Sequence, residues 1–223
     1  MATLARKGMM FVLSSPSGGG KTTLARLLLQ NDADISLSVS CTTRPPRAGE
    51  EHGKDYFFLD AESFAKKRAS DYFYETAQVF GNWYGTPKGA VQEKLASGQD
   101  VLFDVDWQGT RSLAAKARES VVSVFILPPN LAELRRRLTV RAQDAADVID
   151  LRMRRAEEEI AHWSDYDYVL INDSIDLCLQ NILYIVKAER VKRQDSSAVE
   201  RFVNGLLGED RQNSVARRSI GPK

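Results

Sequence analysis

The sequence predicts an α/β fold in which a parallel sheet is flanked by helices, with a smaller α+β segment inserted into it. Short apolar runs such as Met9–Ser14 and Val121–Leu127 read as buried strands. They alternate with segments whose apolar residues recur at helical spacing, as in Ile175–Ala188. A glycine-rich loop joins the first strand to the first helix, and 223 residues suffice for one such core with insertions.

The composition excludes several classes of protein. The 31 basic and 30 acidic residues nearly cancel, so we expect no nucleic-acid or membrane partner. No apolar run reaches the roughly 18 residues of a membrane span, and the N-terminus lacks a signal-peptide core. The two cysteines, Cys41 and Cys178, have no metal-type spacing and indicate free thiols in a reducing compartment. A cytoplasmic enzyme is therefore expected, and its oligomeric state stays undecided.

The glycine-rich loop has the spacing of a phosphate-binding loop, with Ser15 in place of the usual first glycine. The helix that follows directs its positive end at the same anion. Lys21 is expected to reach the β- and γ-phosphates of a nucleotide, and the Thr22 hydroxyl to bind Mg²⁺. The predicted nucleotide-binding residues are Ser15, Pro16, Ser17, Gly18, Gly19, Gly20, Lys21, Thr22 and Thr23. A flexible glycine turn with an exposed lysine is the alternative.

The segment Ser36–Asp60 carries Arg44 and Arg47 around a pair of prolines, which stiffen the loop. Two guanidinium groups on a stiff loop suit the forked recognition of a second phosphate. An ordinary solvated basic loop is equally compatible with the composition alone.

Several stretches of the chain resemble the motifs of a known family. SVSCTTRPPRAGEEHGKDY, from Ser38 to Tyr56, is similar to the guanylate kinase signature. Three further matches follow in order, GNWYGTPK (Gly81–Lys88), DVDWQG (Asp104–Gly109) and IND (Ile171–Asp173). The resemblance implies a P-loop enzyme with ATP as co-substrate, which transfers the γ-phosphoryl group of ATP to GMP with Mg²⁺.

The resemblance also implies roles for single residues. The GMP phosphate would be held by Arg44, Arg47, Tyr56 and Tyr84, and the guanine by Ser40, Glu75 and Thr86. The arginines of a mobile lid would be Arg137, Arg141 and Arg152, which suit the negative charge of a phosphoryl-transfer transition state. Asn172 would approach the adenine of ATP, although an asparagine that satisfies a nearby turn is the alternative.

Two acidic residues follow the apolar run Val101–Phe103. If the strand continues through them, Asp104 and Asp106 project from the same face, toward a ligand crevice at the carboxyl end of the strand. One carboxylate could organise the waters of Mg²⁺, for which Asp104 is the candidate together with Thr22. The resemblance places Asp106 beside GMP. The spacing does not decide which of the two lies nearer the metal.

The expected organisation is one guanylate kinase-like domain over residues 7–192 and a polar tail over 193–223, with a loose end. The core comprises 7–34 and 96–192, the GMP-binding insert about 35–95, and the helical lid about 137–155. Two other functions stay open. The protein could be a related kinase that phosphorylates AMP or a non-nucleotide phosphate, or a binding module that has lost catalysis, although Lys21, Thr22 and Asp104 are all present.

Overall fold

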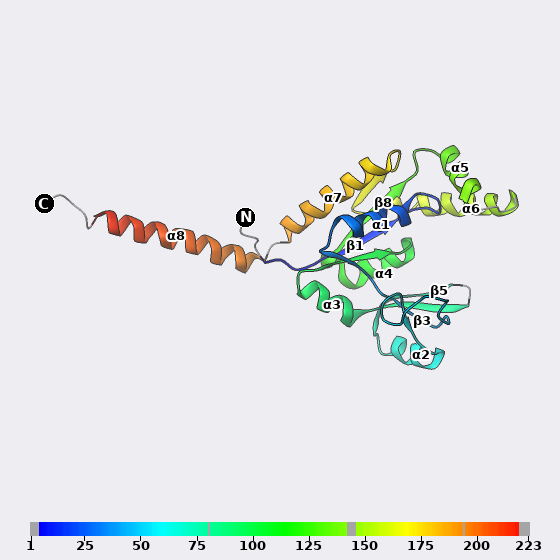
Figure 1. Cartoon of the computed structure of the whole chain (residues 1–223), viewed down its shortest axis with the longest axis horizontal. Helices are drawn as coiled ribbons and strands as arrows, with labels where there is room; N and C mark the ends of the chain where they lie inside the picture. The colour runs from blue at the N-terminus through cyan, green and yellow to red at the C-terminus, as the bar shows by residue number, and fades with distance from the viewer. Residues whose placement is uncertain (1–4, 80, 142–145, 194, 219–223) are drawn as a thin grey trace.

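The computed structural model describes residues 5–79, 81–141, 146–193 and 195–218, which form two sheets with flanking helices (Figure 1). The larger sheet has five strands in the order β2-β7-β1-β8-β9, and all neighbours pair in parallel. Its strands are β1 (Met10–Ser14), β2 (Ile35–Leu37), β7 (Asp100–Asp104), β8 (Val121–Leu127) and β9 (Tyr168–Ile171). The predicted parallel sheet is confirmed.

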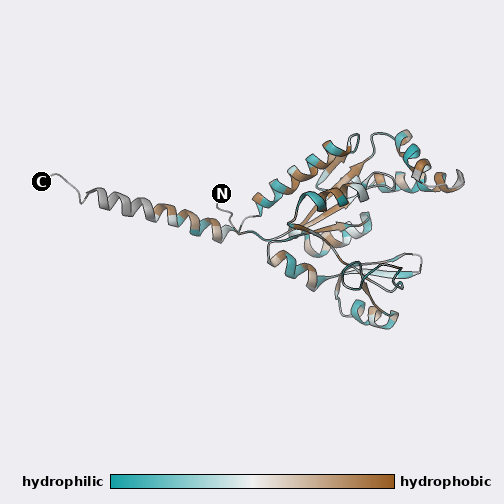
Figure 2. Cartoon of the chain, in the orientation of Figure 1, coloured by the Kyte–Doolittle hydropathy of each residue, from teal (hydrophilic) through white to brown (hydrophobic). Residues whose placement is uncertain are grey.

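Helices cover both faces of this sheet, which explains why its strands are apolar without alternation. One face is covered by α1 (Lys21–Asn31) and α7 (Ile175–Lys192), and the other by α3 (Lys88–Ala96) and α4 (Trp107–Ala117). Successive side chains of β1 point to opposite faces, so Phe11 packs with the first pair of helices and Val12 with the second. The hydrophobic colouring of the central strands in Figure 2 reflects this double burial.

The smaller sheet has the order β4-β3-β6-β5 and carries one helix, α2. Its elements are β3 (Cys41–Thr42), β4 (Phe57–Phe58), α2 (Ala61–Ala69), β5 (Phe73–Val79) and β6 (Asn82–Pro87). This unit comprises fewer residues than the expected insert of residues 35–95. The strand β2 pairs with β7 in the larger sheet, and α3 packs beneath β7, so both elements belong to the core.

Two helices follow β8 in the region of the expected lid. They are α5 (Leu131–Arg141) and α6 (Ala146–Ile160), and residues 142–145 between them lie outside the described residues. A small separate core joins the two helices and consists of Leu134, Leu138, Ile149, Met153 and Ala156. Short 3₁₀ turns, Arg118–Ser120 and Trp163–Asp165, precede β8 and β9.

The segment expected as a polar tail contains a helix, α8 (Ser196–Arg218), that extends away from the body (Figure 1). The expectation of a loose end of the chain stays a prediction, and residues 219–223 lie outside the described part. The helix forms because Phe202, Val203 and Leu206 recur at helical spacing among good helix formers. These apolar side chains are about half exposed, since Phe202 retains 47% and Leu206 49% of its accessible surface.

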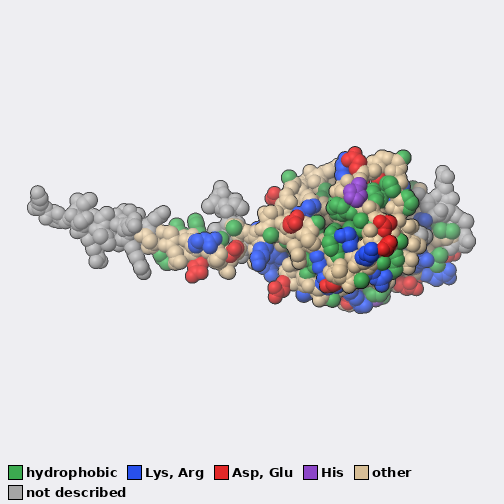
Figure 3. All heavy atoms as spheres, turned by 90° about the horizontal axis from the view of Figure 1, so that it is seen from below, with side chains coloured by type: hydrophobic (Ala, Val, Ile, Leu, Met, Phe, Trp, Pro, Cys, Tyr) green, Lys and Arg blue, Asp and Glu red, His purple; other side chains and the backbone are tan. Residues whose placement is uncertain are grey.

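The surface of the described residues mixes both charges. Figure 3 shows lysine and arginine side chains interspersed with aspartate and glutamate over the face that includes the smaller sheet. Among the described residues, no helix is both long and apolar enough to cross a bilayer.

Candidate active site

The glycine-rich loop forms a concave cradle at the carboxyl end of β1. The helix α1 begins at Lys21, directly after Gly20, so its first N–H groups face the loop. Gly18 and Gly20 have φ values of 87° and 102°, which favour glycine. Ser15 does not have a positive φ, and its hydroxyl donates to the carbonyl of Pro16 at 3.0 Å, so serine fits at this position. Ser15, Pro16, Ser17, Gly18, Gly20, Lys21 and Thr22 line a cavity of about 280 Å³.

The predicted adenine contact, Asn172, lies beneath the cradle. Its side chain is buried, and Nδ2 donates to the carbonyl of Gly19 at 2.9 Å. A side chain on Gly20 would place its Cβ 2.3 Å from Asn172 Nδ2. Asn172 thus supports the backbone of the loop, and its approach to adenine stays a prediction. Thr23 does not line the cavity.

The strand β7 does not continue through both acidic residues, so the expectation that they share a strand face is wrong, although both line one cavity. The strand ends at Asp104, and Asp106 is the N-cap of α4, where its carboxylate accepts the Gly109 N–H at 2.9 Å. The chain turns at Val105 because the cap residue must leave the strand before the helix begins. Asp104 is the closer of the two to the cradle lysine, with 2.5 Å between its Oδ1 and Lys21 Nζ. Asp106 lines the cradle cavity beside Lys21.

A second cavity, of about 620 Å³, lies between the smaller sheet and the start of α4. It is lined by predicted GMP-binding residues from both units, namely Ser40, Tyr56, Glu75, Tyr84 and Asp106. Thr86 joins this group from β6, because its hydroxyl donates to Glu75 Oε1 at 2.8 Å and lies 3.5 Å from the Ser40 hydroxyl. The rings of Tyr56 and Tyr84 meet edge to face at 6.0 Å. The structure therefore brings these six predicted residues together.

The predicted phosphate arginines lie at the rim of the smaller sheet. Arg44 donates to Glu50 at 2.8 Å, and its guanidinium lies 5.4 Å from the centre of the Tyr56 ring. The hydrogen bond from Arg44 and the N–H of Arg47 both hold the pKa of the Glu50 carboxyl below its usual range. Glu50 thus fixes Arg44 and the backbone of Arg47 in one loop. The Arg47 side chain is exposed to solvent.

Glu75 is a partly buried acidic residue of the second cavity. Burial raises the pKa of its carboxyl above the usual value, and the negative charge of Asp106 adds to this effect. The hydrogen bond from Thr86 opposes both. A carboxylate held in this way presents acceptor oxygens to a ligand and is costly to leave unpaired.

The lid arginines are placed unequally by the structure. Arg137 donates to Glu133 at 2.8 Å and to the Asn172 carbonyl at 3.2 Å, next to the cradle. Arg152 lies on α6 and is partly buried. Arg141 ends α5, and its side chain lies outside the described residues.

A magnesium ion is compatible with the oxygen atoms at the cradle. Among the described residues, no group of three or more histidine, cysteine or acidic side chains is arranged to enclose a metal. Mg²⁺ usually binds one or two protein oxygens and takes its other ligands from phosphates and water. The Thr22 hydroxyl and the partly exposed Asp104 carboxylate supply such oxygens, so both predicted ligands fit.

Some residues of the two cavities were not predicted from the sequence. Gln108 and Ser112 on α4 line the second cavity, and Glu159 on α6 lines the first. Their positions depend on contacts between elements far apart in the sequence. Only Gln108 carried a signal, because it lies within the matched stretch DVDWQG.

Comparisons with known proteins show the family to which this chain is similar. The model of the guanylate kinase family matches residues 7–189. The chain is similar to the guanylate kinase of Novosphingobium aromaticivorans, with 55% identity over 92% of each chain. The guanylate kinase of Nitrobacter winogradskyi is also 55% identical, over 90% of this chain and 92% of its own. The crystal structure of the Anaplasma phagocytophilum guanylate kinase aligns with a TM-score of 0.65 at 40% identity, over 84% of this chain and 89% of that one.

Proposed function

The chain belongs to the guanylate kinase family, and we propose that its two cavities carry out that family's reaction, with the cradle holding ATP and the second cavity GMP. The enzyme transfers the γ-phosphoryl group of ATP to GMP, giving ADP and GDP. Its substrates are ATP and GMP, and its family membership implies Mg²⁺.

One observation carries the assignment of the cavities. Asp106 lines both of them, and Asp104 lines the second while its carboxylate touches Lys21 of the first. Two anions bound in adjoining cavities can bring a phosphate oxygen of one near the terminal phosphorus of the other. Positioning of this kind supplies a large part of the rate in phosphoryl transfer.

The residues act mainly through charge. An oxygen of the GMP phosphate forms the new bond to the γ-phosphorus while the bond to the ADP oxygen breaks. A phosphate monoester has a second pKa of about 6, so its oxygens are already ionised at neutral pH and need no general base. Lys21 and the amides of the cradle stabilise the phosphates of ATP, and Arg44 and Arg47 hold that of GMP. Arg137, Arg141 and Arg152 are proposed to balance the charge of the transferred group.

The metal has a limited role in this proposal. When bound by Thr22 and Asp104, Mg²⁺ would neutralise phosphate charge and orient the terminal phosphates. Asp104 would then exchange its ion pair with Lys21 for a metal-bound water, which leaves Lys21 available to the phosphates.

The cavity around Glu75 is proposed to select the base. Guanine presents two neighbouring donors, N1–H and the N2 amine, and an acceptor at O6. The Glu75 carboxylate accepts both donors while the Thr86 hydroxyl donates to the same carboxylate, and the Ser40 hydroxyl donates to O6. Adenine places an unprotonated ring nitrogen against the carboxylate, so that two acceptors face each other. This mismatch favours GMP over AMP. It therefore argues against the alternative function of a related kinase that phosphorylates AMP.

The observed cradle argues against a binding module without catalysis. Lys21, Thr22 and Asp104 all lie at the cradle, and Asn172 supports its backbone from below. A recruitment module has no need for these features. The mixed surface charge offers no basic patch on the face shown in Figure 3, so we propose small-molecule partners alone.

A reducing compartment, the cytoplasm, is proposed for the enzyme. Cys41 and Cys178 are both free and buried, and burial raises the pKa of each thiol to about 11. Thiols in this state are poor nucleophiles and need no disulfide partner.

Transfer of labelled phosphate tests the proposed function directly. ATP labelled at the γ-position is mixed with the enzyme, GMP and Mg²⁺, and the nucleotides are separated. We expect the label in the terminal phosphate of GDP, with one ADP formed for each GDP. Label released only as inorganic phosphate, at a rate independent of GMP, would contradict the proposal.

A further inference from the structure

A carboxylate from the lid helix α6 lies in the cradle. Glu159 stands one residue before the end of α6, and its Oε2 accepts a hydrogen bond from the backbone N–H of Ser17 at 3.2 Å. Its side chain lines the same cavity of about 280 Å³ as Lys21 and Thr22. An anionic group of the protein itself therefore binds an amide of the loop that is proposed to bind the phosphates of ATP.

The orientation of Glu159 is specific among the acidic residues of α6. Glu157 and Glu158 are its neighbours in the sequence, and both are exposed. Met153 and Ala156 face α5 and form part of the small core there. Glu159 is seven residues after Arg152, so two helical turns place both on one side of α6. The contact at Ser17 therefore ties the helix that carries a lid arginine to the cradle.

The charges around Glu159 are those of a phosphate site. Burial raises the pKa of its carboxyl and Asp106 adds to this effect, whereas Lys21 and Arg155 favour the ionised form. Backbone amides of a loop that leads into a helix bind a carboxylate for the same reason that they bind a phosphate. The two anions cannot occupy the same amide and the same neighbourhood of Lys21 together, because like charges in a confined site repel each other.

We propose that Glu159 is a built-in competitor of the nucleotide phosphates, which holds the ligand-free cradle and must leave before ATP is fully bound. This inference rests on the proposed function only in assigning the phosphates of ATP to the cradle. When the Glu159 carboxylate leaves the cradle, the end of α6 is released. Binding of phosphate in the cradle and the position of Arg152 on α6 are therefore coupled. If the two exclude each other, the contact lowers the affinity for phosphate in proportion to the fraction of protein in which it is formed, and removing the carboxylate restores that affinity.

The test compares ligands that differ only in which part of ATP they represent. Binding of ADP, of pyrophosphate alone and of adenosine alone is measured by calorimetry on the whole chain, together with binding of GMP. The variants are Glu159→Gln, which keeps the shape but removes the charge, and Glu159→Ala, which removes the contact. Glu157→Gln is the matched control, because it removes one negative charge from an exposed position of the same helix.

We expect both Glu159 variants to bind ADP and pyrophosphate at least about fivefold more tightly, a coupling of the size usual between linked groups. Adenosine and GMP should bind to the Glu159 variants as tightly as to the parent protein. Glu157→Gln should leave the affinity for all four ligands unchanged. A role in helix stability alone would alter the melting temperature without separating pyrophosphate from adenosine. A thermal melt of each variant records that quantity.

Two results would overturn the inference. Unchanged or weaker binding of ADP and pyrophosphate in the folded Glu159 variants would show that the carboxylate does not compete. An equal gain in Glu157→Gln would assign the effect to net charge. If the parent protein binds neither ADP nor pyrophosphate, it is the proposed function that fails, and the two failures are thereby distinguished.

Discussion

At the scale of single residues, the proposed choice of base depends on one carboxylate. Glu75 lies in the second cavity, accepts a hydrogen bond from Thr86 at 2.8 Å and has a raised pKa because it is buried. The sequence identified Glu75 only through the resemblance to a family. Its burial and its partners follow from the pairing of β5 with β6, which the sequence did not specify residue by residue.

Glu75→Gln should lower kcat/KM for GMP by roughly 10² or more, because a buried charge-assisted pair is replaced by an amide whose NH₂ group faces guanine donors. The preference for GMP over AMP should narrow. Steady-state kinetics with both substrates measure the ratio, and Glu93→Gln, at an exposed position of α3, serves as the control. An unaltered ratio would mean that the base is recognised elsewhere.

The same residue predicts a pH dependence of stability. Below the ordinary carboxyl pKa of about 4.3, Glu75 is neutral in both the folded and the unfolded chain, so no cost arises. As the pH rises from the ordinary pKa toward the raised pKa of the folded chain, Glu75 loses its proton in the unfolded chain first. The folded state then binds more protons, and the free energy of unfolding falls with pH until the folded carboxyl is ionised too.

Relative to the parent, Glu75→Gln should therefore become more stable as the pH rises from about 4 to about 7. Urea denaturation of both proteins at the two pH values gives the difference in free energy of unfolding. A difference that stays constant, or moves in favour of the parent as the pH rises, is incompatible with a raised pKa of Glu75 in the folded state.

At the scale of elements, the cradle depends on close contact between the loop and the end of β9. Gly20 has a φ of 102°, and Asn172 Nδ2 would lie 2.3 Å from a Cβ at this position. Asn172 in turn donates to Gly19 at 2.9 Å. The loop and the residue after β9 therefore have one mutually compatible arrangement.

Gly20→Ala should destabilise the protein by about 1–3 kcal/mol, because alanine is strained at this φ and displaces Asn172. The KM for ATP should rise, since the amides of the cradle move. Gly89→Ala on α3 is the control, because a Cβ added there would meet nothing within 4 Å and alanine is favourable in a helix. Denaturation and kinetics are compared for the two variants, and equal behaviour would refute the account of the loop.

Elements with a strong local pattern could be predicted from the sequence, and those set by distant contacts could not. The strand before the cradle, the helix after it and the strands β7, β8 and β9 follow from apolar runs with clear ends. The strand was predicted to continue through Asp106, but it ends earlier because Asp106 is the N-cap of α4. Glu159 was missed because no local signal links residue 159 to residue 17, which are 142 positions apart.

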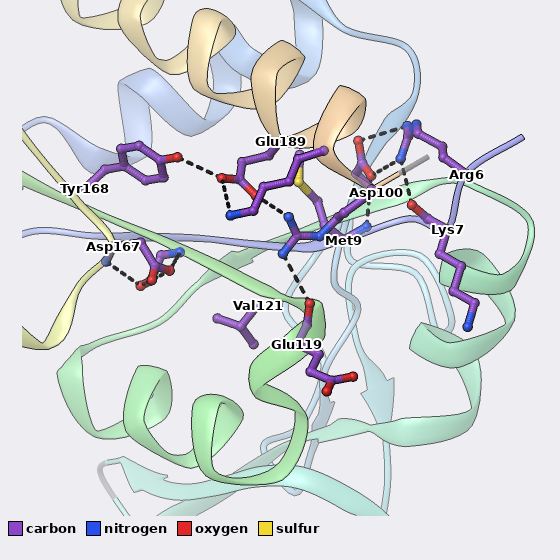
Figure 4. A network of polar contacts seen from close by, with 12 residues as sticks. Arg6, Lys7, Met9, Asp100, Glu119, Val121, Asp167, Tyr168 and Glu189 are labelled. Carbon is purple, nitrogen blue, oxygen red and sulfur yellow. Dashed lines mark hydrogen bonds and ion pairs between the residues drawn. The ribbon is translucent and has the colours of Figure 1, made fainter. Parts of the chain in front are cut away.

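At the scale of the whole molecule, a buried network of ion pairs links distant segments of the chain (Figure 4). It lies at the end of the larger sheet that is opposite the site. Asp100 is fully buried at the start of β7, whereas Asp104 at the other end of the same strand faces Lys21. Asp100 accepts hydrogen bonds from Arg6, Arg190 and the Met9 N–H. The network thus ties the N-terminal segment, the sheet and α7 together.

Asp100→Asn should lower the free energy of unfolding by about 3–5 kcal/mol, because it leaves Arg6 without its carboxylate partner and Arg190 with Asp32 alone. The KM values for ATP and GMP should stay the same in the folded fraction, since the network lies at the far end of β7. Urea denaturation and kinetics measure the two effects, with Asp34→Asn at an exposed position as the control. A large change in KM with unaltered stability would contradict this separation.

The most direct test of the whole account is the release of ADP from ATP and Mg²⁺, measured with GMP, AMP, CMP and UMP in turn, for the parent protein and Lys21→Ala. We predict rapid ADP release with GMP, a rate at least about 10³-fold lower with AMP, and a fall of several orders of magnitude with GMP in the folded Lys21→Ala variant. Equal rates with all four monophosphates, or full activity without Lys21, would contradict the assignment of ATP to the cradle and GMP to the second cavity.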